Sequence, residues 1–259
     1  MKKSVLLSVV LAVLACSVLA APALASGPQK KTAKPAKGPA IDPSATEFFK
    51  RMSDSLAAAK SFSFQARTMT EEVAGNGQFV DIFMMSKVQM VRPNMLKVEE
   101  TGEPRTTTVY YDGSNLTFVD PTLKHYAVTS EPGTVDQLIV ALSEKYGAAL
   151  PMANFLFSDV HAKMMQGVTG GSVIGVATVN DEKCYHLAFT EPAADWQVWV
   201  TTDKRALPMR LSIIYKNVAG NPRVDVELWD WKMDNNINSD EFTFKPTDEY
   251  TKITHLPAK

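Results

Sequence analysis

Apolar and polar residues alternate along this chain with two different periods. From Asp42 to Lys60 the apolar residues recur every three or four positions, which is the period of an amphipathic helix. Asp42 is a suitable N-cap, and Pro43 fits the first turn of a helix. The apolar stripe consists of Ala45, Phe48, Phe49, Met52, Leu56 and Ala59. We therefore expect a helix from Pro43 to about Lys60 that buries one face.

Beyond residue 60 the period changes to two, which is typical of strands with one buried face. The alternating runs are 62–66, 80–90, 96–98, 106–119, 125–128, 185–189, 196–200, 209–215, 224–228 and a last pair, Phe242 and Phe244. Asp112-Gly113 is a strong hairpin signal within 106–119. We expect two further hairpin turns, at Thr202–Arg205 and Ala219–Pro222.

A helical stretch interrupts the strands. Val135, Leu138 and Leu142 share one face and predict a helix over 135–146, and a second helix is expected over 151–165. The order of elements predicts an α+β fold: a strongly curved antiparallel sheet of about ten or eleven strands, an incomplete β-barrel. Because the strands alternate on one side only, we expect the helices to pack on the concave face of that sheet.

The first residues are typical of an export signal. Residues 1–25 combine two lysines, an apolar run and the small-residue site Ala23-Leu24-Ala25, which favours a signal peptide over a membrane-spanning helix. Residues 26–41 hold four lysines, several Pro and Gly and almost no large apolar side chain, which predicts a flexible linker. The remaining residues, 42–259, are expected to form a single domain.

Cys16 leaves a second interpretation of this segment open. Val13-Leu14-Ala15-Cys16 resembles a lipobox, which would make the protein a membrane-anchored lipoprotein instead of a soluble periplasmic one. We favour periplasmic release at the Ala-Leu-Ala site. Cys184 would then be the single remaining cysteine; it lies in a strand-like run and is expected to be buried.

The charge of the chain argues against nucleic acid as a partner. The sequence has 27 basic and 28 acidic residues, but six of the lysines and none of the acids precede residue 42. The predicted domain therefore carries 21 basic against 28 acidic residues, a formal charge of −7. Such a surface would repel phosphates, and membrane contact is expected to be peripheral at most.

The sequence lacks the residue patterns of common active sites. It has no G-x-S-x-G, no H-E-x-x-H and no P-loop, and its four histidines show no paired ligand spacing. We therefore expect no enzyme, no cofactor and no metal. Asp225 and Glu227 could form a glycosidase-like pair, but their position on the polar face of a strand favours a solvated charge ladder.

Several stretches of the sequence resemble a known periplasmic fold. VRPNMLKVE (91–99), VYYDGSNLTFVDP (109–121) and VWVTTDKRALPMRLSI (198–213) resemble the strands and turns of the lipoprotein-carrier fold of LolA, LolB and their relatives. YGAALPMANFLFSD (146–159) and IIYKNVAGNPRVDVELWDW (213–231) are similar to an uncharacterised family of predicted periplasmic proteins thought to share that fold.

The resemblance implies a hydrophobic ligand. In the carriers a helical lid closes an incomplete barrel around an apolar cavity for acyl chains, and an Arg on the sheet helps to hold the lid shut in some of them. Arg92 occupies the matching RP phrase and is our candidate for lid closure. The candidate cavity residues are Phe64, Val80, Ile82, Met84, Val88, Met90, Leu138, Leu142, Met152, Phe155, Met164, Val198, Leu211 and Ile213.

Two functions of different classes fit this picture. The first is a periplasmic protein that binds or carries an acyl chain or lipoprotein, and the many methionines suit a cavity that adapts to its contents. The second is an envelope sensing or interaction module of the same fold, with a protein partner and without ligand transport. Its candidate anchors are Trp199, Trp229 and Trp231, which we expect on the outer face of the sheet.

Overall fold

The computed structural model describes residues 40–103, 106–146 and 151–254, which belong to one compact unit. The predicted signal peptide, residues 1–25, and most of the predicted linker, 26–39, lie outside the described residues. Two short segments, 104–105 and 147–150, and the last residues, 255–259, are outside them as well.

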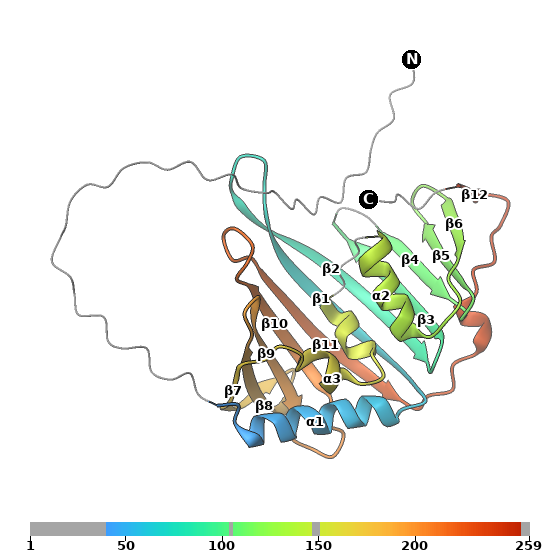
Figure 1. Cartoon of the computed structure of the whole chain (residues 1–259). Helices are drawn as coiled ribbons and strands as arrows, with labels where there is room; N and C mark the ends of the chain where they lie inside the picture. The colour runs from blue at the N-terminus through green and yellow to red at the C-terminus, as the bar shows by residue number, and fades with distance from the viewer. Residues whose placement is uncertain (1–39, 104–105, 147–150, 255–259) are drawn as a thin grey trace. The chain divides into compact units, whose positions relative to one another are not determined.

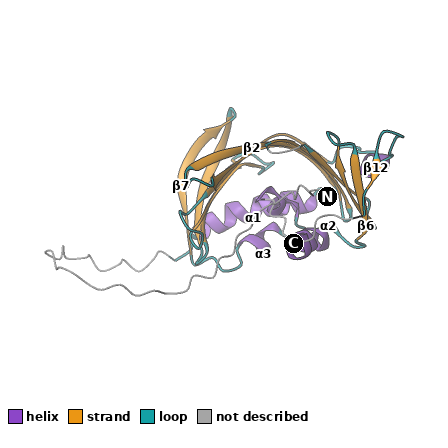
Figure 2. Cartoon of the chain, turned by 90° about the horizontal axis from the view of Figure 1, so that it is seen from above, coloured by secondary structure: helices purple, strands orange, loops and turns teal. Residues whose placement is uncertain are grey.

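A single twelve-stranded sheet organises the described residues. Its strand order is β12-β6-β5-β4-β3-β2-β1-β11-β10-β9-β8-β7, and all pairings are antiparallel except that of β12 with β6. The strands are β1 (Ser61–Val73), β2 (Phe79–Val91), β3 (Met95–Gly102), β4 (Thr107–Tyr111), β5 (Asn115–Asp120), β6 (His125–Ser130), β7 (Gly170–Val179), β8 (Glu182–Thr190), β9 (Ala194–Thr201), β10 (Pro208–Tyr215), β11 (Arg223–Met233) and β12 (Thr251–Lys252). Its two edges, β12 and β7, do not pair, so the sheet stays open and arches over the helices (Figures 1 and 2).

Four helices of the described residues lie inside the arch, on the side of the sheet that we call the concave face (Figure 2). They are α1 (Pro43–Ala58), α2 (Val135–Tyr146), the 3-10 helix η1 (Pro151–Leu156) and the short α3 (Val160–Met164). As predicted, Asp42 caps α1, and its carboxylate accepts a hydrogen bond from the Ser44 N–H at 2.8 Å. The predicted fold class, a curved open antiparallel sheet with helices on its concave face, is confirmed.

Aromatic packing fixes α1 against the C-terminal half of the sheet. The ring of Phe49 lies 5.6 Å from that of Phe189 on β8 and 5.2 Å from that of Trp196 on β9. The Phe189 and Trp196 rings stack on each other with centroids 4.3 Å apart. These three side chains are almost fully buried, so this part of the concave face is filled.

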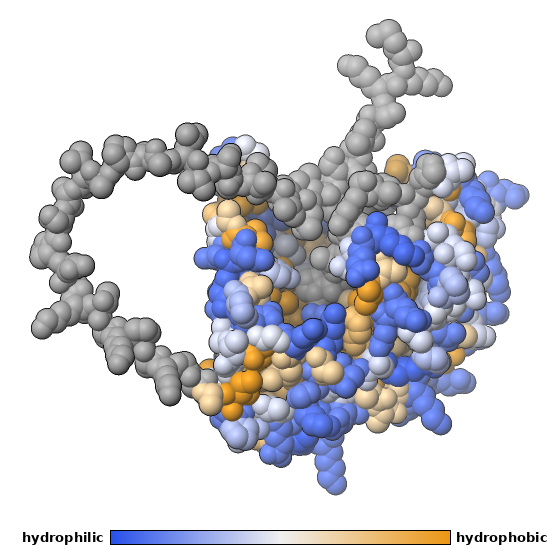
Figure 3. Space-filling model, viewed as in Figure 1, coloured by the Kyte–Doolittle hydropathy of each residue, from blue (hydrophilic) through white to orange (hydrophobic). Residues whose placement is uncertain are grey.

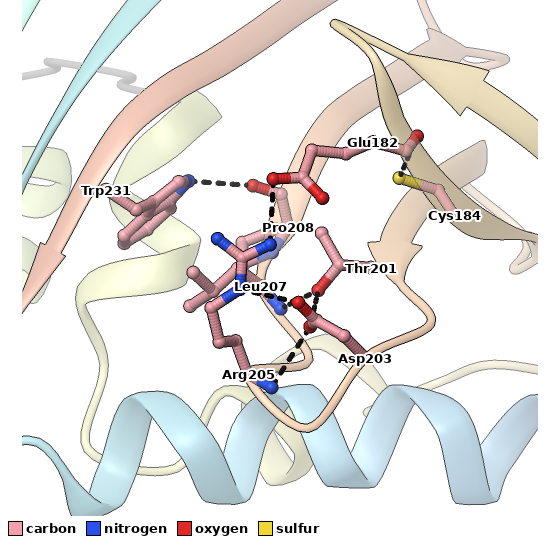
Figure 4. A network of polar contacts seen from close by, with 8 residues as sticks. All are labelled: Glu182, Cys184, Thr201, Asp203, Arg205, Leu207, Pro208 and Trp231. Carbon is pink, nitrogen blue, oxygen red and sulfur yellow. Dashed lines mark hydrogen bonds and ion pairs between the residues drawn. The ribbon is translucent and has the colours of Figure 1, made fainter.

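The turn between β9 and β10 anchors this half further (Figure 4). Arg205 donates hydrogen bonds to Asp203 at 2.6 Å and to Glu182 at the start of β8 at 2.8 Å. Asp203 also accepts from the Thr201 hydroxyl at 2.9 Å, and this hydroxyl in turn accepts from the Leu207 N–H. The predicted turn at Thr202–Arg205 is thus confirmed, and its polar network ties three strand ends together.

One predicted helix is wrong. Residues 151–165 form η1 and α3 with an irregular link between them, not one continuous helix. Ser158 in the link donates its N–H and its hydroxyl to Asp136 of α2. Asp159 then caps α3 by accepting from the Ala162 N–H at 2.8 Å. Polar residues that bond outside the helix break it at this point.

Two strands were not predicted at the sheet edges, and one predicted strand is absent. β7 contains Gly170, Gly171 and Gly175, which hide its alternation; a Cβ at Gly171 would lie 2.6 Å from the Phe189 ring. β12 has two residues, too few to give a pattern. Phe242 ends the 3-10 helix η2 (Ser239–Phe242), and Phe244 lies outside the strands, with its ring against Tyr110, Tyr126 and Tyr250.

Candidate functional site

A cleft of about 280 Å³ lies between the concave face and the α2–η1 segment. Its floor comes from the sheet: Val88 on β2, Leu96 and Val98 on β3, and Tyr215 on β10. Its roof comes from α2, from η1, from Phe157 just after η1, and from α3. The roof residues are Ile139, Val140, Leu142, Ser143, Glu144, Met152, Ala153, Asn154, Leu156, Phe157 and Lys163.

The interior of the cleft is apolar and its rim is polar. The polar lining groups are Ser143, Glu144, Asn154 and Lys163 on the roof and the Tyr215 hydroxyl on the floor. Burial raises the pKa of Tyr215, so its hydroxyl stays neutral at physiological pH. Apolar residues reach the surface beside α2, among charged ones (Figure 3). A lining of this kind suits a ligand with an apolar body.

Arg92 holds the roof to the sheet and to α1. It follows β2 directly, and its guanidinium donates to the carbonyl oxygens of Leu56, Leu156 and Phe157 at 3.2, 3.3 and 3.1 Å. The guanidinium also lies 5.6 Å from the centroid of the Phe62 ring. Burial lowers the pKa of Arg92, while the nearby carboxylate of Asp136 opposes that shift.

Two further contacts hold the roof together. Asp136, in the first turn of α2, accepts the Ser158 N–H at 2.9 Å and the Ser158 hydroxyl at 2.5 Å. The Ser53 hydroxyl of α1 accepts the His161 N–H of α3 at 2.9 Å. These hydrogen bonds add to the apolar packing of the roof, whose residues Leu138, Phe155 and Val160 are buried in the same core as the sheet.

Most of the predicted cavity residues lie together in the hydrophobic core, but only a few of them line the cleft. Val88, Leu142 and Met152 line the cleft. The residues buried in the same hydrophobic core without lining the cleft are Phe64, Met90, Leu138, Phe155, Met164, Val198, Leu211 and Ile213. Val80, Ile82 and Met84 lie on the same face of β2 but are only half-buried.

Sequence reasoning missed several cleft residues. Leu96, Val98 and Tyr215 occupy inward positions of their strands, and Ile139 lies on the apolar face of α2. Alternation shows that such residues face inward, but it does not show which of them border empty space. Inward residues that border empty space differ from the others in how closely the facing side chains pack against them.

The tryptophans divide between the two faces of the sheet. The prediction that Trp231 lies on the outer face is wrong: its ring stacks on Phe64 at 4.4 Å, and its indole N–H donates to the Pro208 carbonyl (Figure 4). The cause is an irregularity in the pairing of β1 with β11, where Asp230 adopts a φ of 54°. The extra residue inverts the alternation, so positions after it exchange faces.

The carboxylates of β11 bind arginines. Asp225 pairs with Arg210 at 3.4 Å, and Glu227 pairs with Arg67 at 2.8 Å. Both pairs lie on the face away from the helices, as expected for a charge ladder. Within the described part of the chain, no group of three or more His, Cys, Asp or Glu residues is arranged to hold a metal ion. None of the described helices has the length and apolar character needed to cross a bilayer.

The sequence matches the model of one protein family. The model described as "Predicted periplasmic protein (DUF2092)" matches residues 45–256, nearly all of the described part. The chain belongs to this family. The resemblance to a family of predicted periplasmic proteins is thereby confirmed, and none of the curated proteins matches the sequence.

Solved structures similar to this DUF2092 chain share little sequence with it. An uncharacterized conserved protein from Thermus thermophilus has a TM-score of 0.47 and 9% identity, over 82% of this chain and 99% of that one. A LolA superfamily protein from Nitrosomonas europaea has a TM-score of 0.40 and 12% identity, over 77% and 97%. The lipoprotein LppX from Mycobacterium tuberculosis has a TM-score of 0.39 and 13% identity, over 77% and 100%.

Proposed function

We propose that this DUF2092 protein binds the acyl chain of a lipid or lipoprotein in the cleft under α2. The observation that supports this most is the combination of an apolar cleft with a roof that Arg92 clasps to the sheet. Binding, and not catalysis, is proposed because most of the cleft lining is apolar and offers contacts to an apolar ligand. The ligand would be held by apolar contacts and oriented by the polar rim.

The size of the cleft indicates a closed state. About 280 Å³ falls just below the range of about 300–1,000 Å³ that is usual for ligand pockets. An acyl chain of about sixteen carbons gains roughly 12 kcal/mol when fully buried, at about 0.8 kcal/mol per CH₂. To bury the whole chain, the roof has to move away from the sheet. That gain exceeds the cost of breaking a few hydrogen bonds, each worth about 1.5–3 kcal/mol when one partner is charged.

We therefore propose that Arg92 holds the roof against the sheet, and we call it the latch. Movement of the roof would break its bonds to the Leu156 and Phe157 carbonyls, while its bond to Leu56 of α1 can remain. Asp136 and Ser158 move together in this scheme, because both belong to the roof. The latch would keep the cleft closed until an apolar ligand replaces the lost contacts.

Native mass spectrometry of protein purified from cell envelopes tests the proposal. We expect a bound lipid mass in the wild type and its loss in Val88→Phe, which fills the floor of the cleft. Val176→Phe is the matched control, because Val176 is exposed on edge strand β7 and the same volume is added there. Lipid bound equally by all three proteins, or by none of them, would refute the proposal.

We also propose that the protein reaches the periplasm through residues 1–25 as a cleaved signal peptide, with residues 26–41 as a linker. Release after Ala25 predicts a mature N-terminus at Ser26, which intact-mass measurement detects. The alternative is a lipoprotein anchored through Cys16. Incorporation of labelled palmitate that disappears in Cys16→Ser would establish the anchored form in place of the soluble one.

A further inference from the structure

Exposed apolar side chains gather at two neighbouring hairpin tips. The first tip joins β1 to β2, and the second joins β10 to β11 (Figure 1). The Phe79 ring lies directly over Gly220: a Cβ at that glycine would be 2.5 Å from the ring. Phe79 is 50% exposed and Phe83 is 49% exposed. The other exposed apolar residues of this region are Val73, Met85 and Val218.

The first half of β2 is apolar on both faces. Phe79, Phe83 and Met85 point away from the helices, whereas Val80, Ile82 and Met84 point to the concave side, and only Asp81 in this run is charged. Strands with apolar residues on both faces are usually buried on both. In the first half of β2 the outward-facing apolar residues are exposed. Beyond Met85, as far as Met90, the strand alternates between buried residues on the concave side and more exposed polar ones on the outer side.

Both tips are free of charge and their turns are hydrogen-bonded internally. Residues 73–80 and 217–222 contain no Asp, Glu, Lys, Arg or His. In the first turn the Ala74 N–H donates to the Gln78 carbonyl and the Gly77 N–H to the Ala74 carbonyl, each at 2.8 Å. In the second, the Asn221 N–H donates to the Val218 carbonyl at 3.0 Å. Such turns can enter an apolar phase with few unsatisfied polar groups.

From these observations we infer that the two tips dock the protein into the interface of a zwitterionic lipid bilayer. The tips project from the sheet (Figure 1) and present exposed Phe79, Phe83 and Val218 beside uncharged turns, a combination that suits insertion at a bilayer interface. A bilayer adapts to a projecting surface, whereas a protein partner would need a matching hollow. Glu71, Glu72 and Asp81 flank the first tip, and Lys216 and Arg223 flank the second, so the flanking charges nearly balance and a zwitterionic membrane fits better than a strongly charged one.

Membrane docking involves only the two hairpin tips. The concave-side residues of β2 add a connection: Val80, Ile82 and Met84 lead along one face of the strand towards Val88 in the cleft floor. A lipid leaving a docked membrane would meet this apolar row first. That connection rests on the proposed function, whereas membrane docking does not.

Flotation of the purified protein with phosphatidylcholine vesicles tests the docking. Removal of both exposed rings, in Phe79→Ser/Phe83→Ser, is expected to lower the partition coefficient about tenfold or more, because each ring loses the burial of its exposed half. The matched control is Ile174→Ser/Val176→Ser, whose side chains are 58% and 63% exposed and lie on edge strand β7, which does not belong to either tip. This control should float like the wild type.

A second measurement reports on the tip itself. Asn76→Cys places a thiol in the first turn for a polarity-sensitive fluorophore, and Cys184 does not compete because it is fully buried. Vesicles should shift the emission of this label to the blue and leave the same label at Thr178→Cys unchanged. Three results would overturn the inference: a wild type that does not float, equal losses in both double variants, or self-association through the tips without vesicle binding. Acyl-chain binding by a protein that fails to float would leave the cleft proposal intact.

Discussion

The two halves of the concave face differ in how completely side chains fill them. Under α1, the rings of Phe49, Phe189 and Trp196 fill the curve of the sheet. Under α2, the helix contributes aliphatic side chains such as Leu138 and Leu142, and a space of about 280 Å³ remains. Two of the three rings in the filled half come from β8 and β9, so the side chains of the sheet and of the helix together decide where the protein is solid and where it is hollow.

The largest expected effect comes from emptying the filled half. Phe49→Ala should destabilise the protein by about 3–5 kcal/mol, because it removes a fully buried ring and leaves a cavity among packed aromatic residues. Leu142→Ala beside the existing cleft should cost less, about 2 kcal/mol, the lower end of the range for buried leucines. Urea unfolding of both variants measures the difference. Equal losses would show that the two halves are packed alike.

The next effect concerns the latch. Arg92→Leu should lower stability by about 3 kcal/mol, because three buried carbonyl groups lose a charged donor. It should also speed amide exchange in α2 and η1 while leaving α1 slow. Arg51→Leu is the matched control, since Arg51 is only half-buried and makes a long bond of 3.4 Å to the Asp203 carbonyl. We expect less than about 0.5 kcal/mol for it. A latch variant that behaves like this control would exclude Arg92 from roof closure.

A smaller effect is expected inside the roof. Asp136→Ala removes the carboxylate that accepts two hydrogen bonds from Ser158 and that lies in the first turn of α2. The loss should be about 1–2 kcal/mol. Thermal unfolding measures it, with Asp54→Ala as the control, because Asp54 forms only an exposed i,i+4 pair with Lys50. An unchanged midpoint in Asp136→Ala would mean that α2 and η1 are held together by apolar contacts alone.

The smallest effect concerns a buried thiol on β8, on the face away from the helices, that should not react. Burial raises the pKa of Cys184 to about 11, so the thiolate needed for alkylation does not form near neutral pH. Folded protein lacking residues 1–25 should therefore resist iodoacetamide at pH 8, whereas urea-unfolded protein should react. The shift is upward, so reactivity of the folded protein should rise only as the pH approaches 11. Rapid reaction at pH 8 would show that the structure around the start of β8 opens.

Local patterns predicted the elements that position the cleft. Alternation and turn signals located most strands, and the apolar stripe located α2 with its observed bounds. They failed where a single residue changes the geometry. The positive φ of Asp230 inverts the facing of Trp231, and the bond from Asp136 to Ser158 divides the predicted helix 151–165. Both depend on contacts between segments far apart in the sequence, which a one-dimensional period does not contain.

The sequence indicated which residues face inward, but not which of them border the cleft. Arg92 was identified through a resemblance, and the structure shows its bonds to the roof. The inward positions of Phe155 and Leu211 were also correct, yet these residues pack in the solid part of the core. Whether an inward residue borders a cleft depends on how helices fill the curve of the sheet, and that is a property of the assembled fold.

Amide hydrogen exchange with and without palmitate tests the central claim most directly, because it reads both halves of the concave face at once. We predict that saturating palmitate changes exchange in α2 (Val135–Tyr146) and η1 (Pro151–Leu156) and leaves α1 (Pro43–Ala58) unchanged. Val88→Phe should abolish the change and Val176→Phe should preserve it. Exchange that stays the same throughout, or that changes equally in α1 and α2, would contradict an acyl-chain site under α2.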